Sequence, residues 1–141
     1  MLLATLLMLT VTAGENAPTV VQAAECPVRV DHAKIFNLVA NEPAVLLYAA
    51  TNLADGDLEH FTVIAYIFDA AGTLKAKQIA PGRHILEKGT TKYSTMVLDG
   101  WAVTATDRVI FGVNQAQRLD SQKWWRAELE DVAVAMAKKQ P

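Results

Sequence analysis

The clearest pattern of apolar and polar positions lies in residues 58–74, around which the rest of the chain is organised. Between Phe61 and Phe68 the odd-numbered and the even-numbered positions are both largely apolar. Successive side chains of a strand point to opposite faces, so this pattern predicts a central β-strand that is covered on both faces. The sequence Asp-Ala-Ala-Gly at 69–72 then predicts a hairpin turn, because Asp accepts backbone hydrogen bonds and Gly tolerates a positive φ.

Further segments show the same extended pattern, and Pro, Gly, Asn and Asp residues separate them. The expected strands are residues 26–38, 44–51, 74–80, 92–98, 108–117 and 123–126, with a shorter one at 83–86. Lys75 and Lys77 share one face of their segment, which indicates an edge strand, where charge discourages pairing with another sheet. We expect the connection at 101–106 to fold Trp101 inward.

A helical pattern is found in the tail of the chain. Within residues 128–139, apolar side chains recur at the i, i+3, i+4 and i+7 spacing, beginning at Leu129. Acidic residues come first and Lys138 and Lys139 come last, an order that complements the helix dipole. These features predict a short C-terminal helix.

About seven short strands, with turn signals at intervals of about 8–12 residues, are typical of an all-β antiparallel sandwich. A βαβ arrangement is disfavoured because no helical pattern separates the strands. A closed β-barrel is the structural alternative.

The first residues of the chain have the character of a signal peptide. Residues 1–13 are apolar apart from threonines, and they are too few for a membrane span, which needs about 20 residues. Small side chains favour cleavage after Ala23, with Ala13 as the second choice. No Lys or Arg precedes Arg29, so the usual basic n-region is missing and translation could start upstream. A buried N-terminal helix is the alternative.

We therefore expect a signal peptide at 1–23 and a single domain at 24–141. The mature chain would have no transmembrane span and would be exported, to the periplasm or the medium. The chain has 141 residues, of which 52% are hydrophobic and 20% charged, which is enough apolar material for a core. Its formal net charge is -2 and its basic residues are scattered, so nucleic acid is excluded as an expected partner.

A single cysteine limits the covalent chemistry of the chain. Cys26 alone excludes an internal disulfide framework and a multi-cysteine metal site. It can be a small unpaired thiol, or it can form a homodimer by pairing with the Cys26 of a second copy. Catalysis by this thiol would need a base and an orienting group, and Pro27 beside it indicates neither.

The sequence offers no catalytic, cofactor-binding or metal-binding set. His32, His60 and His84 are not at a metal-site spacing, and neither Ser94 nor Ser121 lies in a GxSxG motif. GxGxxG and P-loop motifs are missing, and the carboxylates are scattered through turns. We therefore expect no enzyme activity and no cofactor.

Trp124 and Trp125 are the most unusual local feature. Neighbouring side chains on a strand point to opposite faces, so one ring enters the core and the other faces solvent, a partner or the C-terminal helix. A large exposed aromatic side chain is a good binding anchor, so this pair is the candidate binding surface. The alternative is that the C-terminal helix covers the second ring.

One part of the chain resembles a known family. Asn52 in a loop, a strand ending in Phe68-Asp69, the following Ala-Ala-Gly and Leu74 resemble FxLYD-type and related immunoglobulin-like domains of secreted bacterial proteins. The likeness covers residues 44–117, where the full motif is replaced by the sequence Tyr-Ile-Phe-Asp at 66–69. It implies an immunoglobulin-like β-sandwich outside the cytoplasm and brings no catalytic residue.

The resulting hypothesis is an exported β-sandwich that acts as a binding, accessory or structural module. One alternative is a small hydrolase-like or metal-dependent enzyme with a spatially assembled site. Another is an envelope-associated, oligomeric interaction protein that uses an exposed sheet edge.

Overall fold

A computed structural model of the chain describes residues 17–37, 43–98, 103–119, 123–126 and 128–139. Residues 1–16, Trp101 and Ser121 lie outside this part. The described part contains eight strands and one helix. Their bounds are β1 Thr19–Val21, β2 Val28–Phe36, β3 Ala44–Asn52, β4 Leu58–Phe68, β5 Leu74–Pro81, β6 Thr91–Leu98, β7 Arg108–Arg118, β8 Lys123–Trp125 and α2 Leu129–Lys139.

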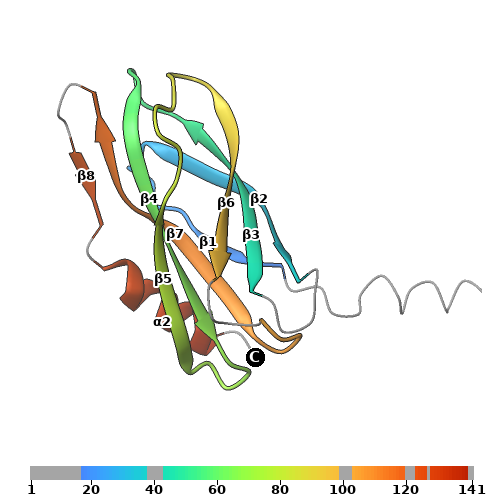
Figure 1. Cartoon of the computed structure of the whole chain (residues 1–141). Coiled ribbons are helices and arrows are strands. Elements are labelled where there is room, and N and C mark those ends of the chain that lie inside the picture. Colours follow the sequence, from blue (N-terminus) through green and yellow to red (C-terminus); the bar gives the residue numbers. More distant parts are fainter. Residues whose placement is uncertain (1–16, 38–42, 99–102, 120–122, 127, 140–141) are drawn as a thin grey trace, which may run out of the picture.

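The strands form two sheets that face each other (Figure 1). The smaller sheet has the order β2-β3-β6, and the larger has the order β5-β4-β7 with β1 and β8 both paired to β7. Strands β2 to β8 can be lettered A, B, C, C′, E, F and G, which gives the sheets A-B-E and C′-C-F-G of an immunoglobulin-like sandwich. The predicted antiparallel β-sandwich with a C-terminal helix is confirmed, and the described strands do not close into a barrel.

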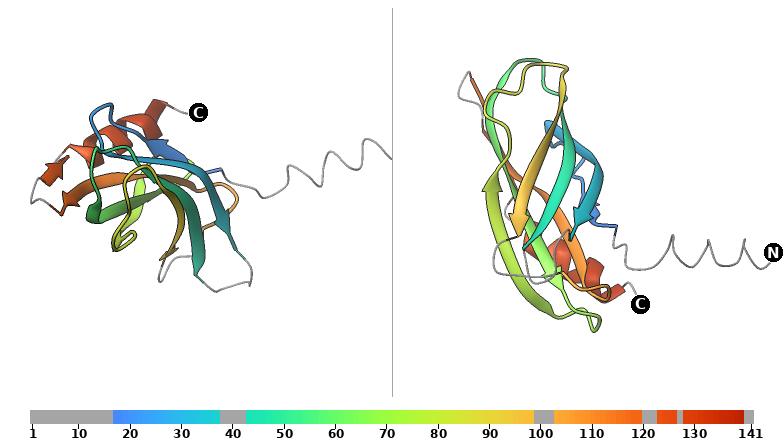
Figure 2. Two further views of the ribbon diagram at one scale, coloured as in Figure 1. Left: turned by 90° about the horizontal axis from the view of Figure 1, so that it is seen from above. Right: turned by 45° about the vertical axis from the view of Figure 1, so that its right-hand side comes forward.

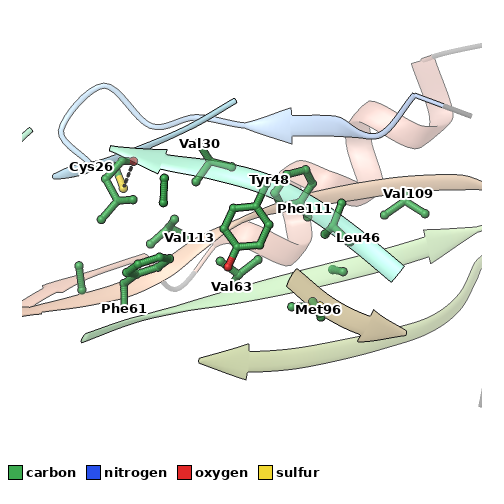
Figure 3. Close-up of a cluster of buried hydrophobic side chains, with 14 of the residues drawn as sticks. Cys26, Val30, Leu46, Tyr48, Phe61, Val63, Met96, Val109, Phe111 and Val113 are labelled. Atoms are coloured by element: carbon green, nitrogen blue, oxygen red, sulfur yellow. Dashed lines mark hydrogen bonds between the residues drawn. The ribbon is translucent and has the colours of Figure 1, made fainter. Parts of the chain in front are cut away.

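Two apolar clusters hold this architecture together. The inner cluster fills the space between the sheets, and Figure 3 shows several of its side chains, including Phe61, Val63, Tyr48 and Phe111. The rings of Tyr48 and Phe111 come from opposite sheets and lie 5.6 Å apart between centroids, a typical tilted contact. This cluster accounts for the inward face of β4.

The outer cluster lies between the larger sheet and α2, which packs against that sheet's outer face (Figure 2). Its members are Val21, Tyr66, Phe68, Ile110, Leu129, Ala133 and Ala137. The small side chains of Ala133 and Ala137 let the helix approach the aromatic rings of β4 closely. The outer cluster explains why β4 is apolar on its second face as well.

The hairpin between β4 and β5 has the predicted turn. Asp69 Oδ1 accepts hydrogen bonds from the backbone N–H groups of Ala71 at 2.9 Å and Thr73 at 3.0 Å. Gly72 has a φ of 84° and donates its N–H to the Asp69 carbonyl. An L-residue with a side chain is strained at such a φ.

β5 lies at the edge of its sheet, as its lysines predicted. Lys77 Nζ pairs with Glu130 Oε1 of α2 at 2.8 Å, and Lys75 Nζ pairs with Asp107 Oδ2 at 2.7 Å. β5 is therefore tied to both the helix and the segment that leads into β7.

Two sequence expectations differ from the structure. The expected strand at 83–86 is reduced to one bridge between Leu58 and Leu86, because Ile85 has a φ of 57° and breaks the extended run. Conversely, β1 was not expected as a strand, and it pairs in parallel with β7.

We predict that Gly72→Val lowers the free energy of unfolding by more than about 1 kcal/mol, because a β-branched residue resists a positive φ. A Cβ at this position would also lie 3.2 Å from the Ala137 carbonyl oxygen of α2. Thermal and chemical denaturation would measure the loss. Ala71→Val, at the exposed neighbouring position, is the control and should cost much less; equal effects of the two changes would contradict this turn geometry.

We predict a pH-dependent role for Asp107, whose side chain is 3% exposed. Burial opposes its charge, but the Lys75 ammonium and the Thr104 N–H outweigh that effect and lower the pKa of this carboxyl. A lowered folded-state pKa contributes stability above the unfolded pKa of about 3.9, and this is lost as the pH falls towards the folded value. Asp107→Asn should therefore cost about 1–3 kcal/mol at pH 7.

The difference between Asp107→Asn and the wild type should shrink when denaturation is repeated below about pH 4. Asp131→Asn, an exposed acid on α2, is the control, with an expected effect of less than about 1 kcal/mol. A deficit for Asp107→Asn that stays constant across this pH range would show that the ion pair does not cause it.

Candidate functional site

An open cleft of about 490 Å³ lies at one end of the sandwich. Three segments form it: residues 24–27 before β2, residues 53–55 after β3, and the paired strands β7 and β8. The lining residues are Ala24, Glu25, Cys26, Pro27, Leu53, Ala54, Asp55, Ala116, Arg118, Lys123 and Trp124. Loops at the end of a sandwich are a common place for binding, because the sheets behind them are rigid.

The apolar part of the cleft centres on Trp124 and Leu53. β8 pairs with β7 so that Trp124 lies opposite Ala116, and the half-buried indole packs against the inner cluster. Leu53 is 53% exposed, which is high for a large aliphatic side chain. An indole anchored in the core and an exposed leucine in the same cleft provide apolar contact surface of the kind that binds ligands.

A buried asparagine builds the wall that carries Leu53. Asn52 is 1% exposed; its Nδ2 donates to the carbonyls of Gly56 at 2.9 Å and Leu86 at 2.8 Å, and its Oδ1 accepts from the Ala54 N–H at 2.8 Å. The Leu53 N–H donates to the Pro27 carbonyl at 2.8 Å, which joins this wall to the segment before β2. Leu53 is therefore held in place by its backbone although its side chain is exposed.

The rim of the cleft carries charges of both signs. Asp55 Oδ1 accepts a hydrogen bond from Arg118 Nη1, and this contact lowers the pKa of the Asp55 carboxyl. Glu25 and Lys123 are exposed elsewhere on the lining. With two acidic and two basic residues the lining has no net charge, which suits a neutral or zwitterionic ligand better than an ion of one sign.

Cys26 lies beneath the cleft and is 5% exposed. Its Sγ donates to the Val28 carbonyl at 3.2 Å (Figure 3). Burial raises the pKa of this thiol to about 11, so it stays protonated at neutral pH, whereas a nucleophile must be a thiolate. The same burial argues against the alternative of a homodimer through Cys26 and favours the unpaired thiol, because the sulfur of a second copy cannot reach this atom without displacing its surroundings.

The candidate residues for metal binding are dispersed. His32 lies at an irregularity of β2 with a φ of 50°, His60 lies on β4, and His84 follows β5. Across the described ranges, no three His, Cys, Asp or Glu side chains gather as a metal site would require. Among the described residues, no helix has the length and the apolar character that a membrane span requires.

The two candidate tryptophans differ in how much of their position the structure describes. Trp124 lines the cleft, and the backbone of Trp125 pairs with Gln115, while the Trp125 side chain lies outside the described part. Sequence reasoning missed Leu53 and the pair of Asp55 and Arg118. An apolar residue between the turn formers Asn52 and Asp55 was the only local signal for this wall.

A second surface of note is the outer face of the sheet β2-β3-β6. Phe36 is 37% exposed, Tyr93 53% and Val97 45%. Cross-strand register places Phe36 and Val97 on either side of Val45, and Tyr93 opposite Ala49. These side chains form an apolar strip that α2 does not cover, because α2 packs on the other sheet.

Comparison with known proteins supports the fold alone. No protein-family model and no curated protein that was compared matches this chain. The crystal structure of a hypothetical protein from Peptoclostridium difficile 630 is similar in fold, with a TM-score of 0.59 and 9% sequence identity. The similarity covers 80% of this chain and 92% of that one.

We predict that the Cys26 thiol reacts slowly with an aromatic disulfide reagent in the native chain at pH 8. The thiolate fraction falls about tenfold for each pH unit below the pKa, and an unfolded thiol has a pKa of about 8.5. Denatured protein is the control and should react at once, and the native rate should rise as the pH approaches 11. Equal native and denatured rates, or a covalent dimer on a non-reducing gel, would contradict a buried thiol.

Proposed function

We propose that this protein is an exported binding module, periplasmic or secreted, whose ligand occupies the cleft beside Trp124. The observation that carries the proposal is that the exposed Leu53 and the core-anchored indole of Trp124 line the same cleft of about 490 Å³. Ligand pockets are typically about 300–1,000 Å³, mostly apolar, with a few polar groups that fix orientation. Export is inferred from the apolar residues 1–13, which have the character of a leader.

A peptide segment with an apolar side chain is the ligand class that fits this cleft best. The apolar side chain would contact Trp124 and Leu53. The charges of both signs at the rim would pair with the polar groups of the peptide backbone and its neighbouring side chains. A reaction is not favoured here, because the thiol nearest the cleft is protonated at neutral pH.

A second candidate is an interaction protein that uses the strip formed by Phe36, Tyr93 and Val97 on the outer face of the smaller sheet. Exposed apolar side chains that gather on one face can mark interaction sites on soluble proteins. This candidate corresponds to the envelope-associated oligomeric alternative, with the sheet face in place of a sheet edge.

One experiment separates the two surfaces. A displayed library of random peptides is selected on the immobilised wild-type protein, and the selected peptides are titrated against Leu53→Ser, Tyr93→Ser and Ile79→Ser. All three positions are exposed, so the substitutions should leave the melting temperature nearly unchanged. Ile79 lies on edge strand β5 outside both surfaces and is the control.

We predict that Leu53→Ser weakens binding about tenfold or more, while Ile79→Ser and Tyr93→Ser leave it unchanged. Loss of binding with Tyr93→Ser alone would move the function to the strip on the smaller sheet. Selected peptides that bind all three variants equally would contradict both candidates.

A further inference from the structure

Strand β1 lies inside the segment that the sequence assigns to the leader. Cleavage after Ala23 would remove Thr19–Val21 together with Gln22 and Ala23. Each of these residues makes contacts with the sandwich. A cut after Ala23 would remove those contacts from the folded domain.

The backbone of β1 completes the edge of β7. Its three residues pair in parallel with Ile110–Gly112. β8 pairs with β7 further along, at Gln115–Gln117, so β1 and β8 together cover this edge of the strand. Without β1, backbone groups of β7 beside α2 would lose their partners, which is unfavourable for a partly buried strand.

Position 112 has no room for a side chain while β1 is in place. A Cβ at this position would lie 2.8 Å from the Val21 carbonyl oxygen and 3.1 Å from Leu129 Cδ1 of α2. Glycine weakens the interior of a strand and often marks a close approach of another backbone. The glycine within the apolar run of residues 109–113 of β7 is therefore explained by the approach of β1.

Side chains of the same segment join both apolar clusters. Val21 is 9% exposed and belongs to the outer cluster under α2, and Ala23 is 8% exposed and belongs to the inner cluster. The Ala23 carbonyl accepts the Cys26 N–H at 3.2 Å, a turn that leads into the cleft wall. Cleavage after Ala23 would remove core material and the start of this turn.

The side chain of Gln22 hydrogen-bonds to the backbone at the edge of β2, where no described strand is paired. Its Nε2 donates to the Val28 carbonyl at 3.0 Å, and its Oε1 accepts the Val30 N–H at 3.1 Å. The side-chain amide thus makes the two hydrogen bonds that a neighbouring strand would make, and it covers part of an exposed sheet edge.

We propose that the leader of this chain is removed after Ala13, so that the mature protein begins at Gly14 and keeps β1. Val11 and Ala13 place small side chains at the third and first positions before the cut, as a leader peptidase requires. The five residues from Gly14 to Pro18 then precede β1. The inference rests on the proposed export, and the test below gives different results if the cleavage position is wrong and if export itself is wrong.

The test is N-terminal sequencing and intact mass of the full chain produced in a bacterial host, with periplasm and medium analysed apart from the cytoplasm. A start at Gly14 is expected. A start at Ala24, or at any residue beyond Thr19, would overturn the inference and leave export standing. Exclusively cytoplasmic protein that retains Met1 would overturn export itself. Ala13→Phe should abolish processing, whereas the control Ala17→Phe, at an exposed position between the two sites, should not.

A stability comparison tests the structural reason independently of export. Chains that begin at Gly14 and at Ala24 are melted with and without Gly112→Ala. The longer chain should melt higher, and Gly112→Ala should lower its midpoint by about 4 °C or more while affecting the shorter chain less. Equal midpoints for the two chains, or an equal effect of Gly112→Ala in both, would show that β1 does not belong to the folded domain.

Discussion

The structure depends on one constraint, which is that β4 must be covered on both faces. Phe61 and Val63 on one face need the second sheet, and Tyr66 and Phe68 on the other need α2. At about 25 cal/mol per Å², a strand with two exposed apolar faces would forgo a large part of the burial that stabilises a domain of this size. The sandwich and the helix packed behind it both follow from this requirement.

Much of the fold could be predicted because its signals are local. Strands β2 to β8 show extended apolar patterns between turn formers, and α2 shows a helical period with charges that suit its dipole. β1 could not be found in this way. Three residues, Thr-Val-Val, carry little pattern, they follow an apolar leader, and their partner is about 90 residues away on β7, with nothing local to indicate a parallel pairing. The irregular residue Ile85 is likewise set by tertiary contact, through the bridge of Leu58 and Leu86.

The candidate site was predictable only in part, for the same physical reason. Trp124 could be predicted as a candidate binding residue because paired tryptophans are uncommon. The cleft around it, however, arises from segments that meet only in the folded chain. Asp55 and Arg118 are 63 residues apart in sequence. Leu53 is followed by a loop whose backbone is held by the hydrogen bonds of buried Asn52, an arrangement that residue type alone does not indicate. Propensities describe single elements, whereas a cleft depends on how elements pack.

The cleft and the N-terminal strand are physically coupled, and this links the two proposals. Residues 24–27 form one wall of the cleft, and they begin at the turn in which the Cys26 N–H donates to the Ala23 carbonyl. That turn is fixed from the other side by β1 on β7 and by the amide of Gln22 on β2. If the proposed ligand contacts this wall, it would bind best when β1 is docked, and by linkage its binding would stabilise the docked strand. The contacts that fasten the first strand to the sandwich thus also hold one wall of the proposed binding cleft in place.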